Sequence, residues 1–227
     1  MRFGFKQLFQ VAGLDRYMQI VKCFRDEDLR ADRQPEFTQI DLEMSFAEEE
    51  DIYSLMEGMM KHVWEDVLGE TIETPFPRMS YHEAMHKYGS DKPDLRFNLP
   101  ITDVTEWANQ TDFKIFRNAP CARAIKINGQ FSRKQIDAFT EKVKIYGAKG
   151  LAWLKQENGE LAGSIAKFIE KPPVELEDGD HLFFVADQEH TVADSLGALR
   201  LHLGEECDLI NKDQWKFVWI TDFPLLE

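Results

Sequence analysis

A strict two-residue alternation between Phe37 and Phe46 constrains the fold of this chain more than any other feature of its sequence. The even-numbered positions are mostly apolar, whereas the odd-numbered positions carry an aromatic ring, an amide and two acids. This pattern predicts a strand with one face in a core and the other face lining a polar cleft. We expect a second strand at 17–25, joined to the first by a charged loop at 26–36, so that both strands contribute to a ligand site. The alternating residues are Thr38, Ile40, Leu42, Met44 and Phe46 on the core side and Phe37, Gln39, Asp41 and Glu43 on the cleft side.

Apolar residues at helical spacing and signals for helix ends predict three helices around this strand pair. The first covers 5–13 and ends at a glycine, which can take the left-handed conformation that closes a helix. The second runs from an acidic start at 48 to 67, is amphipathic, and is expected to pack on the sheet. The third covers 80–89, where Glu83 is expected to act as the acid of a capping box.

Short strands and helices follow one another from 98 to 211. Their order predicts an α+β module with helices on one face of a mainly antiparallel sheet. Ser132, with Gln135 three residues later, predicts a capping box at the start of a helix. The pair Asn158-Gly159 between two apolar runs is a strong hairpin signal. A further strand is expected at 215–226, and its partner should lie outside the module. The elements expected within the module are helices at 104–109, 132–147 and 191–203 and strands at 113–116, 122–127, 151–155, 161–169 and 181–186.

The composition excludes several classes of protein. The chain has 27 Lys and Arg against 41 Asp and Glu, a formal net charge of −14, which disfavours nonspecific adhesion to nucleic acid. No apolar run approaches the roughly 20 residues of a membrane span, and the N-terminus lacks the pattern of a signal peptide. Three scattered cysteines form no close pair, which disfavours a disulfide framework and a structural zinc site. We therefore expect a cytoplasmic protein with neither a membrane nor DNA as a partner.

The pentapeptide His82-Glu83-Ala84-Met85-His86 matches H-E-x-x-H, the helical zinc motif of metalloproteases. The extended form of this motif needs a third histidine at position 92, which is Lys92 here, and a protonated lysine cannot ligate zinc. A catalytic zinc takes three protein ligands, and the motif offers two. A zinc hydrolase is thus a remote alternative to two surface histidines on a short helix.

The charged loop at 26–36, between the two expected strands, has two interpretations. Its mixed charges are typical of a solvated, self-compensating loop. A functional interpretation follows from the strand geometry. Arg25 is able to bind a phosphate with two hydrogen bonds, Phe37 to stack on a flat heterocycle, and Asp41 to accept hydrogen bonds from an ammonium group. Together these residues describe a site that forms an aminoacyl-adenylate.

The stretch FRDEDLRADRQPEFTQID at 24–41 closely resembles motif 2 of class II aminoacyl-tRNA synthetases, in the form of the bacterial-type aspartyl-tRNA synthetases. FKQLFQVAGLDRYMQIVKCF before it, YGSDKPDLRF after it and WITDFPLLE at the end are similar to the same family. Residues 98–213 look like the GAD domain inserted in these enzymes. The resemblance implies a partial catalytic domain at 1–97, the inserted domain at 98–213, and a strand that returns to the catalytic domain at 214–227.

The resemblance also implies roles for individual residues. Arg25 is expected to contact the ATP α-phosphate and the aspartate carboxylate, and is the expected catalytic residue. ATP with magnesium, L-aspartate and tRNA(Asp) are the implied cofactor and substrates, and a homodimer is implied for the parent enzyme. The implied sites are Arg25, Asp26, Glu27, Gln34 and Phe37 for ATP, Lys6, Arg25, Gln39 and Asp41 for aspartate, and Asp28, Arg30 and Arg33 for the tRNA acceptor end.

The chain departs from the family pattern in three respects. Residues 1–4 replace a Ser-Pro-Gln-Leu stretch, so one expected aspartate contact is absent. Nothing resembles motif 1 or the anticodon-binding barrel, and motif 3, with its magnesium ligands, is also absent. We therefore expect an internal fragment of an aspartate–tRNA ligase that does not aminoacylate tRNA alone. The alternative is a noncatalytic module whose GAD part binds tRNA or a protein.

Overall fold

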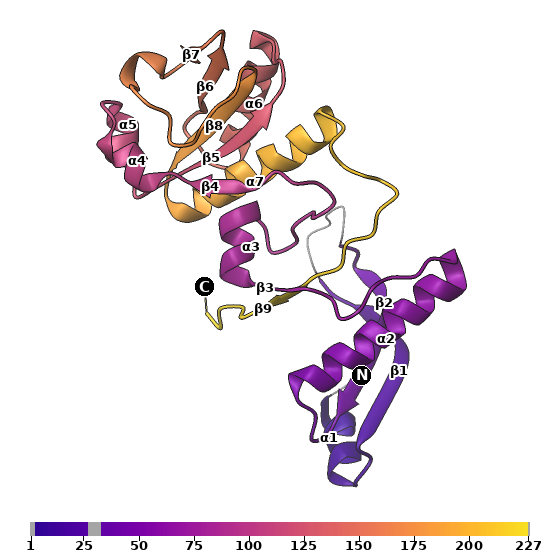
Figure 1. The fold of residues 1–227 in the computed structure, drawn as a ribbon. Coiled ribbons are helices and arrows are strands. Elements are labelled where there is room, and N and C mark those ends of the chain that lie inside the picture. The colour runs from indigo at the N-terminus through magenta and orange to yellow at the C-terminus, as the bar shows by residue number, and fades with distance from the viewer. Residues whose placement is uncertain (1–2, 27–32, 227) are drawn as a thin grey trace. The chain divides into compact units, whose positions relative to one another are not determined.

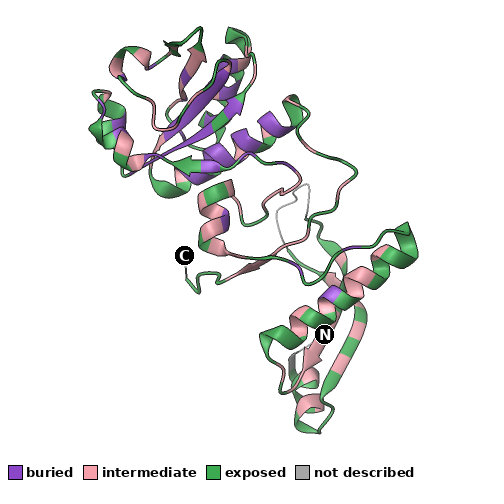
Figure 2. Cartoon of the chain, viewed as in Figure 1, coloured by how far each residue is buried: buried purple, intermediate pink, exposed green. Residues whose placement is uncertain are grey.

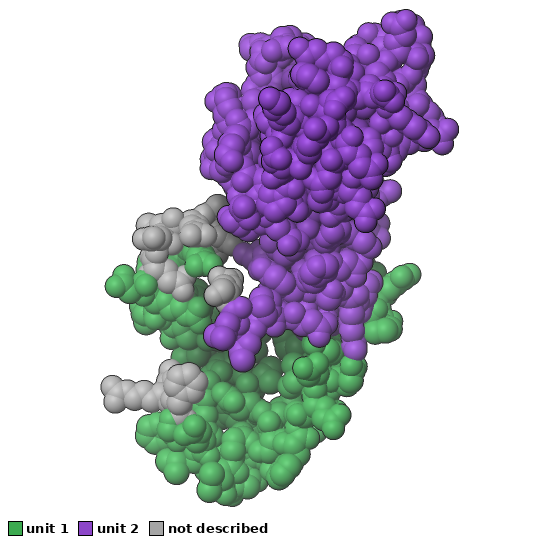
Figure 3. Space-filling view, turned by 90° about the vertical axis from the view of Figure 1, so that its left-hand side faces the viewer, with its two compact units in different colours: residues 1–75 green, residues 76–227 purple. Residues whose placement is uncertain are grey.

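The computed structural model describes residues 3–26 and 33–226 (Figure 1). Packing divides the chain into two compact units, unit 1 at 1–75 and unit 2 at 76–227 (Figure 3). This is a division by packing, and the domain boundaries expected at 97 and 213 stay predictions. Among the described residues, no helix combines the length and the apolar character that a bilayer span requires.

Unit 1 contains the strand pair that the alternation predicts. Strands β1 and β2 are antiparallel, and their register places Gln19 opposite Asp41 and Val21 opposite Gln39. Helix α2 opens with a capping box between Glu48 and Asp51, in agreement with the acidic start expected there. The elements are α1 Phe3–Val11, β1 Arg16–Phe24, β2 Glu36–Met44 and α2 Glu49–Leu68.

The prediction that the apolar side of the strand pair lies in a core is wrong for most of this side. Ile20 is 71% exposed and Ile40, its partner across the pair, is 48% exposed. Leu42 and Met44, which line a cavity together with Leu55 of α2, are half-buried. The apolar side of α2 is itself half-buried or exposed. A two-stranded sheet and one helix supply too little apolar surface to bury this face.

Unit 2 is built on a five-stranded sheet with the order β4-β5-β8-β6-β7, in which every neighbouring pair is antiparallel. A separate parallel pair joins β3 to β9. The strands are β3 Arg78–Ser80, β4 Ile101–Asp103, β5 Cys121–Asn128, β6 Ala152–Glu157, β7 Glu160–Gly163, β8 Asp180–Asp187 and β9 Trp219–Thr221. The helices are α3 Tyr81–Tyr88, α4 Thr105–Gln110, α5 Lys114–Arg117, α6 Arg133–Ile145, the short 3-10 helix η1 Ala166–Phe168 and α7 Glu189–Glu206.

Helices cover both faces of this sheet, which corrects the expectation of helices on one face. Ile125 and Phe183 pack with α6 and α7 in one apolar cluster. Ala124 and Phe184, their neighbours along β5 and β8, pack with α4, α5 and η1 in a second cluster. The central strands are buried on both sides (Figure 2), so consecutive residues enter opposite cores instead of alternating between core and solvent.

Sequence patterns in unit 2 predict some strands and turns correctly and others wrongly. Asn158 and Gly159 have positive φ angles of 53° and 79° and close the β6–β7 hairpin as predicted. Residues 113–116, predicted as a strand, instead cap and begin helix α5, where Phe116 is buried in the second cluster. The final strand is shorter than predicted, but its partner β3 lies outside 98–213, as expected.

The predicted capping box of α6 is present and gives a direct test of local stability. The Ser132 hydroxyl accepts a hydrogen bond from the Gln135 N–H, and the Gln135 side chain accepts one from the Ser132 N–H at 2.9 Å. Ser132→Ala should lower the free energy of unfolding by about 1 kcal/mol, whereas Ser132→Asp retains an acceptor and should cost much less. Urea denaturation of the three proteins measures this difference. Equal loss in both variants would contradict a capping role.

His181 of β8 should make unit 2 less stable in mild acid. The residue is 2% exposed, its ring lies among Phe131, Trp153 and Phe183, and its Nδ1 lies 3.2 Å from the carbonyl oxygen of Gly179. Burial lowers the pKa of His181 below its usual value. The unfolded state, with an imidazole pKa of about 6.5, therefore binds the extra proton first, and stability falls as the pH falls through that value.

The substitution His181→Phe removes this titration and keeps a ring in the cluster. We expect a smaller loss of stability between pH 7.5 and 5.5 than in the unchanged protein, measured by urea midpoints at each pH. Burial also lowers the pKa of His86, so part of the slope should persist. His62→Phe on the exposed side of α2 is the control, and an equal effect of both substitutions would argue against a role for burial.

Two glycines bring helices α3 and α7 into backbone contact. Gly89 ends α3 with a φ of 66°, and an added Cβ atom would collide with the carbonyl oxygen of Ala193. A Cβ on Gly197 would lie 2.6 Å from the carbonyl oxygen of Gly89. The close approach of the two backbones therefore requires glycine at both positions. At Gly89 the left-handed backbone conformation also favours glycine.

Arg200 of α7 holds the segment that follows α3. The residue is 1% exposed, and its guanidinium donates hydrogen bonds to the carbonyl oxygens of Leu99 and Asp94, both at 2.8 Å, and of Phe97 at 3.1 Å. The guanidinium also lies over the rings of Tyr88 and Phe97. Burial lowers the pKa of Arg200 to about 10, so that it stays charged at neutral pH.

Candidate functional site

The polar side of the strand pair carries the residues that the sequence analysis places in a cleft. Phe37, Gln39, Asp41 and Glu43 of β2 lie opposite Cys23, Val21, Gln19 and Tyr17 of β1. Helix α1 lies over one end of this side, where the ring of Phe9 stacks on the ring of Tyr17 with 5.7 Å between centroids. The structure therefore brings a helix, not an open cleft, to the end that contains Asp41.

Lys6 of α1 and Asp41 of β2 form the centre of a polar network. The Lys6 ammonium lies 2.6 Å from Asp41 Oδ1 and 3.1 Å from Glu43 Oε1. The Gln19 amide donates to the other oxygen of Asp41 at 3.1 Å. The side chains of Lys6 and Asp41 are 14% and 13% exposed. Charge and two directed donors thus fix the Asp41 carboxylate.

The same contacts shift the pKa values of Lys6 and Asp41. The hydrogen bond to Asp41 raises the pKa of Lys6 above its usual value. In turn, the hydrogen bond from Lys6 lowers the pKa of Asp41. Both groups are therefore charged at neutral pH, and a ligand that carries an ammonium and a carboxylate can exchange with them.

Arg25 and Phe37 lie together at the other end of the polar side. The Arg25 guanidinium lies over the Phe37 ring, 5.3 Å from its centroid, and the Arg25 N–H donates to the carbonyl oxygen of Pro35 at 2.9 Å. The thiol of Cys23 donates to the Gln39 amide oxygen at 3.3 Å. One predicted phosphate-binding residue and one predicted stacking residue are thus in contact.

The remaining predicted residues divide between described and undescribed parts of the chain. Asp26, Arg33 and Gln34 are exposed at the two ends of the loop. Glu27, Asp28 and Arg30 lie outside the described residues, and their expected roles stay predictions.

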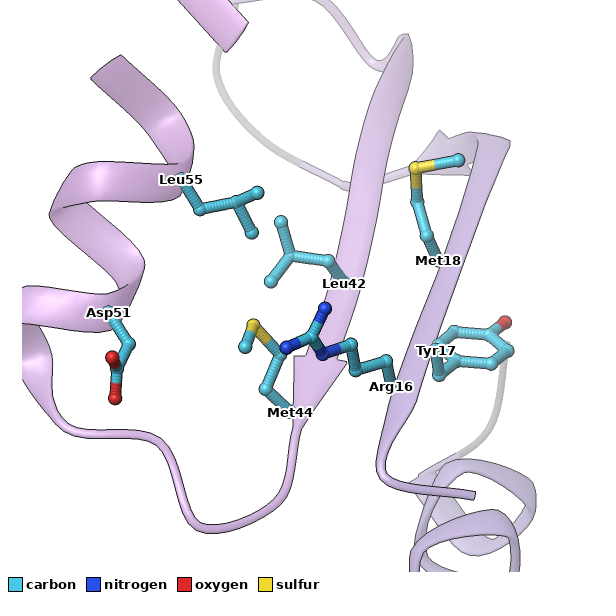
Figure 4. A pocket seen from close by; sticks show the side chains of 7 residues that line it. All are labelled: Arg16, Tyr17, Met18, Leu42, Met44, Asp51 and Leu55. Carbon is cyan, nitrogen blue, oxygen red and sulfur yellow. The ribbon is translucent and has the colours of Figure 1, made fainter. Parts of the chain in front are cut away.

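A cavity of about 370 Å³ lies on the apolar side of the strand pair, not on the polar side. Figure 4 shows Leu42 and Met44 of β2 and Leu55 of α2 pointing toward one another, with Arg16 of β1 extending toward the same space. None of the residues predicted to bind aspartate or ATP lines this cavity. It reflects the incomplete packing of α2 on the sheet.

The H-E-x-x-H pentapeptide forms most of helix α3. Ser80 caps the helix by accepting a hydrogen bond from the Glu83 N–H at 3.1 Å, but the Glu83 carboxylate pairs with Lys87 at 2.7 Å. The predicted capping box is therefore only half formed, because a lysine one turn ahead competes for the acid. The rings of His82 and His86 stack with 5.7 Å between centroids. Within residues 3–26 and 33–226, no group of three or more His, Cys, Asp or Glu is arranged to hold a metal ion.

The sequence assigned no functional role to two members of the polar network. Gln19 was part of a predicted strand without a role, and Glu43 was placed on the cleft side without one. The register that sets Gln19 against Asp41 is the signal that reveals them, and it depends on the loop between the strands. The buried Arg123 and Arg200 carry no local sequence signal.

Comparison with known proteins gives the class. The family model of class II tRNA synthetases (D, K and N) matches residues 4–227, and the chain belongs to this family. Among curated relatives, the aspartate–tRNA(Asp/Asn) ligase of Bacillus cytotoxicus is 54% identical, and the aspartate–tRNA ligase of Staphylococcus saprophyticus is 52% identical. Each match covers 98% of this chain and 40% of the relative. A hypothetical protein from Pyrococcus horikoshii is 19% identical over 38% of this chain and 51% of its own, with a TM-score of 0.30, too low to inform the fold.

Proposed function

We propose that this chain carries the aspartate- and ATP-binding part of an aspartate–tRNA ligase. The observation that carries the proposal is the similarity to aspartate–tRNA ligases over 98% of the chain. The polar side of the strand pair supports it, because Lys6 and Asp41 offer one charge of each sign to an amino acid whose side chain is acidic. The chain spans 40% of the length of these relatives, so the activity of the whole enzyme is part of the proposal.

The proposed reaction has two steps. The α-carboxylate of L-aspartate attacks the α-phosphorus of ATP, which expels pyrophosphate and forms aspartyl-adenylate. A hydroxyl of the terminal ribose of tRNA(Asp) then attacks the aspartyl carbonyl and expels AMP. Both steps depend on the alignment of charged groups and on neutralisation of phosphate charge.

The residues of the strand pair divide these tasks. Arg25 neutralises the α-phosphate and the attacking carboxylate. Lys6 binds the side-chain carboxylate of aspartate, and Asp41, beside Gln39, binds its ammonium. The substrate thus replaces the Lys6–Asp41 ion pair with two ion pairs, one between Lys6 and the substrate carboxylate and one between Asp41 and the substrate ammonium. Phe37 stacks on adenine, on the ring face that Arg25 leaves open.

Other parts of the proposal concern the loop and the partners. Asp26, Glu27 and Gln34 help to bind ATP with magnesium, the cofactor in general use by this class, and Asp28, Arg30 and Arg33 meet the tRNA acceptor end. Residues 98–213 form an inserted GAD domain between two parts of the catalytic domain, 1–97 and 214–227. The parent enzyme is a homodimer.

A chimaera tests the proposal. The corresponding segment of the Bacillus cytotoxicus relative is replaced by this chain, and aspartate-dependent ATP–pyrophosphate exchange is measured together with charging of tRNA(Asp). We expect exchange with aspartate and none with lysine or asparagine. A folded chimaera that exchanges pyrophosphate with asparagine instead of aspartate would overturn the assignment of substrate.

A further inference from the structure

A second cavity, of about 580 Å³, lies in unit 2 and contains none of the residues of the proposed aspartate site. Its walls come from the start of α3, from β5, from the start of α7 and from the chain after β9. Most of the wall is apolar, with a few polar groups converging on it, which is the usual make-up of a small-ligand site. The lining residues are Tyr81, His82, Met85, Arg123, Glu189, His190, Ala193, Asp222 and Pro224.

Arg123 is the anchor of this cavity. Its side chain is 2% exposed, yet its Nε has no hydrogen-bond partner among the described residues. The nearest carboxylate to Nε is Asp103, at 3.8 Å, which is too long for a hydrogen bond. Of the other nitrogens, Nη1 makes a long contact of 3.4 Å to the Met85 carbonyl oxygen and Nη2 donates to the Glu189 carboxylate. A buried guanidinium with an unmet donor is costly and is suited to bind a further oxygen ligand.

Glu189 occupies the place that a ligand anion would take. Glu189 lines the cavity and its carboxylate accepts a hydrogen bond from Arg123, but its side chain is 67% exposed. Rotation into solvent would therefore free Arg123 without disturbing the core. The ion pair shows that Nη2 of this guanidinium donates to an anionic oxygen.

The surrounding groups favour an anion over a cation. Helices α3 and α7 both begin at the cavity, and the N-terminal end of a helix carries partial positive charge. The imidazoles of His82 and His190 are able to donate hydrogen bonds. The opposing charges are Glu189, which would be displaced, Asp222, which accepts a hydrogen bond from Thr221 at 2.9 Å, and Asp103, which lies near Arg123 and His86.

We propose that this cavity binds a phosphate group, with Arg123 as its anchor and Glu189 as the internal carboxylate that it displaces. Arginine presents paired donors that match phosphate oxygens, and the volume leaves room for a flat group beside the phosphate, against Tyr81 and the histidine rings. The phosphate belongs to a small phosphorylated molecule or to an RNA backbone. The proposal does not depend on the aspartate–tRNA ligase assignment, because its residues are separate from those of the strand pair.

Titration of the full chain with inorganic phosphate, phenyl phosphate and a hexauridylate RNA tests the proposal by calorimetry. The decisive variant is Glu189→Gln, which removes the competing charge and should bind inorganic phosphate about tenfold more tightly than the unchanged chain. Glu205→Gln at the other end of α7 is the matched control and should bind as the unchanged chain does. Arg123→Met should abolish phosphate binding. If this variant fails to fold, the tighter phosphate binding expected of Glu189→Gln still tests the proposal.

The outcomes separate the sources of the phosphate. Tight binding of phenyl phosphate with weak binding of RNA identifies a small molecule, and the reverse identifies an RNA backbone. Either result supports the proposal when Glu189→Gln binds the same probe more tightly than the unchanged chain does. Absence of phosphate binding in both the unchanged chain and Glu189→Gln, or equal affinity in Glu189→Gln and Glu205→Gln, overturns it. Lys6→Met should leave phosphate binding unchanged, which distinguishes this cavity from the aspartate site.

Discussion

Lys6→Met, introduced into the chimaeric ligase, is expected to lower aspartate-dependent pyrophosphate exchange by about 100-fold, the scale of losing one directed charge from an active site. The substitution removes the cation 2.6 Å from Asp41 and 3.1 Å from Glu43. The side-chain carboxylate of aspartate would then meet two acids without a compensating charge. The loss should appear mainly as a higher KM for aspartate, with the KM for ATP little changed.

Two further substitutions separate substrate recognition from general damage. Asp41→Asn should also raise the KM for aspartate, because the ammonium of the substrate loses its charged partner. Lys22→Met is the matched control. Lys22 is an exposed lysine of β1 whose ammonium lies 2.6 Å from the Glu36 carboxylate, and neither residue belongs to the Lys6–Asp41 network. If Lys22→Met and Lys6→Met had the same effect, the proposed role of Lys6 would be wrong.

Gly89→Ala is expected to destabilise unit 2 by about 3 kcal/mol, the sum of a left-handed backbone and an overpacked contact. The new methyl group would collide with the Ala193 carbonyl oxygen in α7, and neither helix backbone can move without disturbing the buried residues of α7. Hydrogen–deuterium exchange resolves the effect by segment. Amides of α3 and α7 should exchange faster, while those of β1 and β2 should keep their rates.

Gly150→Ala is the control for this prediction. Gly150 also lies in unit 2, but an added Cβ there meets nothing within 4 Å. We expect its exchange rates and unfolding midpoint to match those of the unchanged chain. A loss of stability in Gly150→Ala as large as in Gly89→Ala would mean that glycine flexibility, and not the helix contact, is responsible.

The sequence was most informative where local chemistry decides the structure. The alternation at 37–46 predicted β2, the Asn158-Gly159 pair predicted a hairpin, and Ser132 with Gln135 predicted the start of α6. Each of these signals depends on residues within a few positions of one another. The resemblance to class II synthetases likewise rested on short continuous stretches of sequence, most specifically on 24–41, and the family match confirms it.

Failures occurred where distant residues decide the outcome. Residues 113–116 have the apolar character of a strand, but packing of Phe116 beneath the sheet favours a helical turn. Burial of β8 on both faces depends on α4 and α5, which come far earlier in the chain. The contact between Lys6 and Asp41 spans 35 positions, and only the fold brings α1 over β2.

The five-stranded sheet of unit 2 ends in two short edges, β4 with three residues and β7 with four. Short edges expose few unpaired N–H and C=O groups, so this sheet is a poor template for strands of neighbouring molecules. The strand pair of unit 1 has the opposite character, because β1 and β2 each run for nine residues and, in the described part of the chain, each has one lateral edge without a strand beside it. In concentrated solution, strand-to-strand association should therefore begin at β1 or β2.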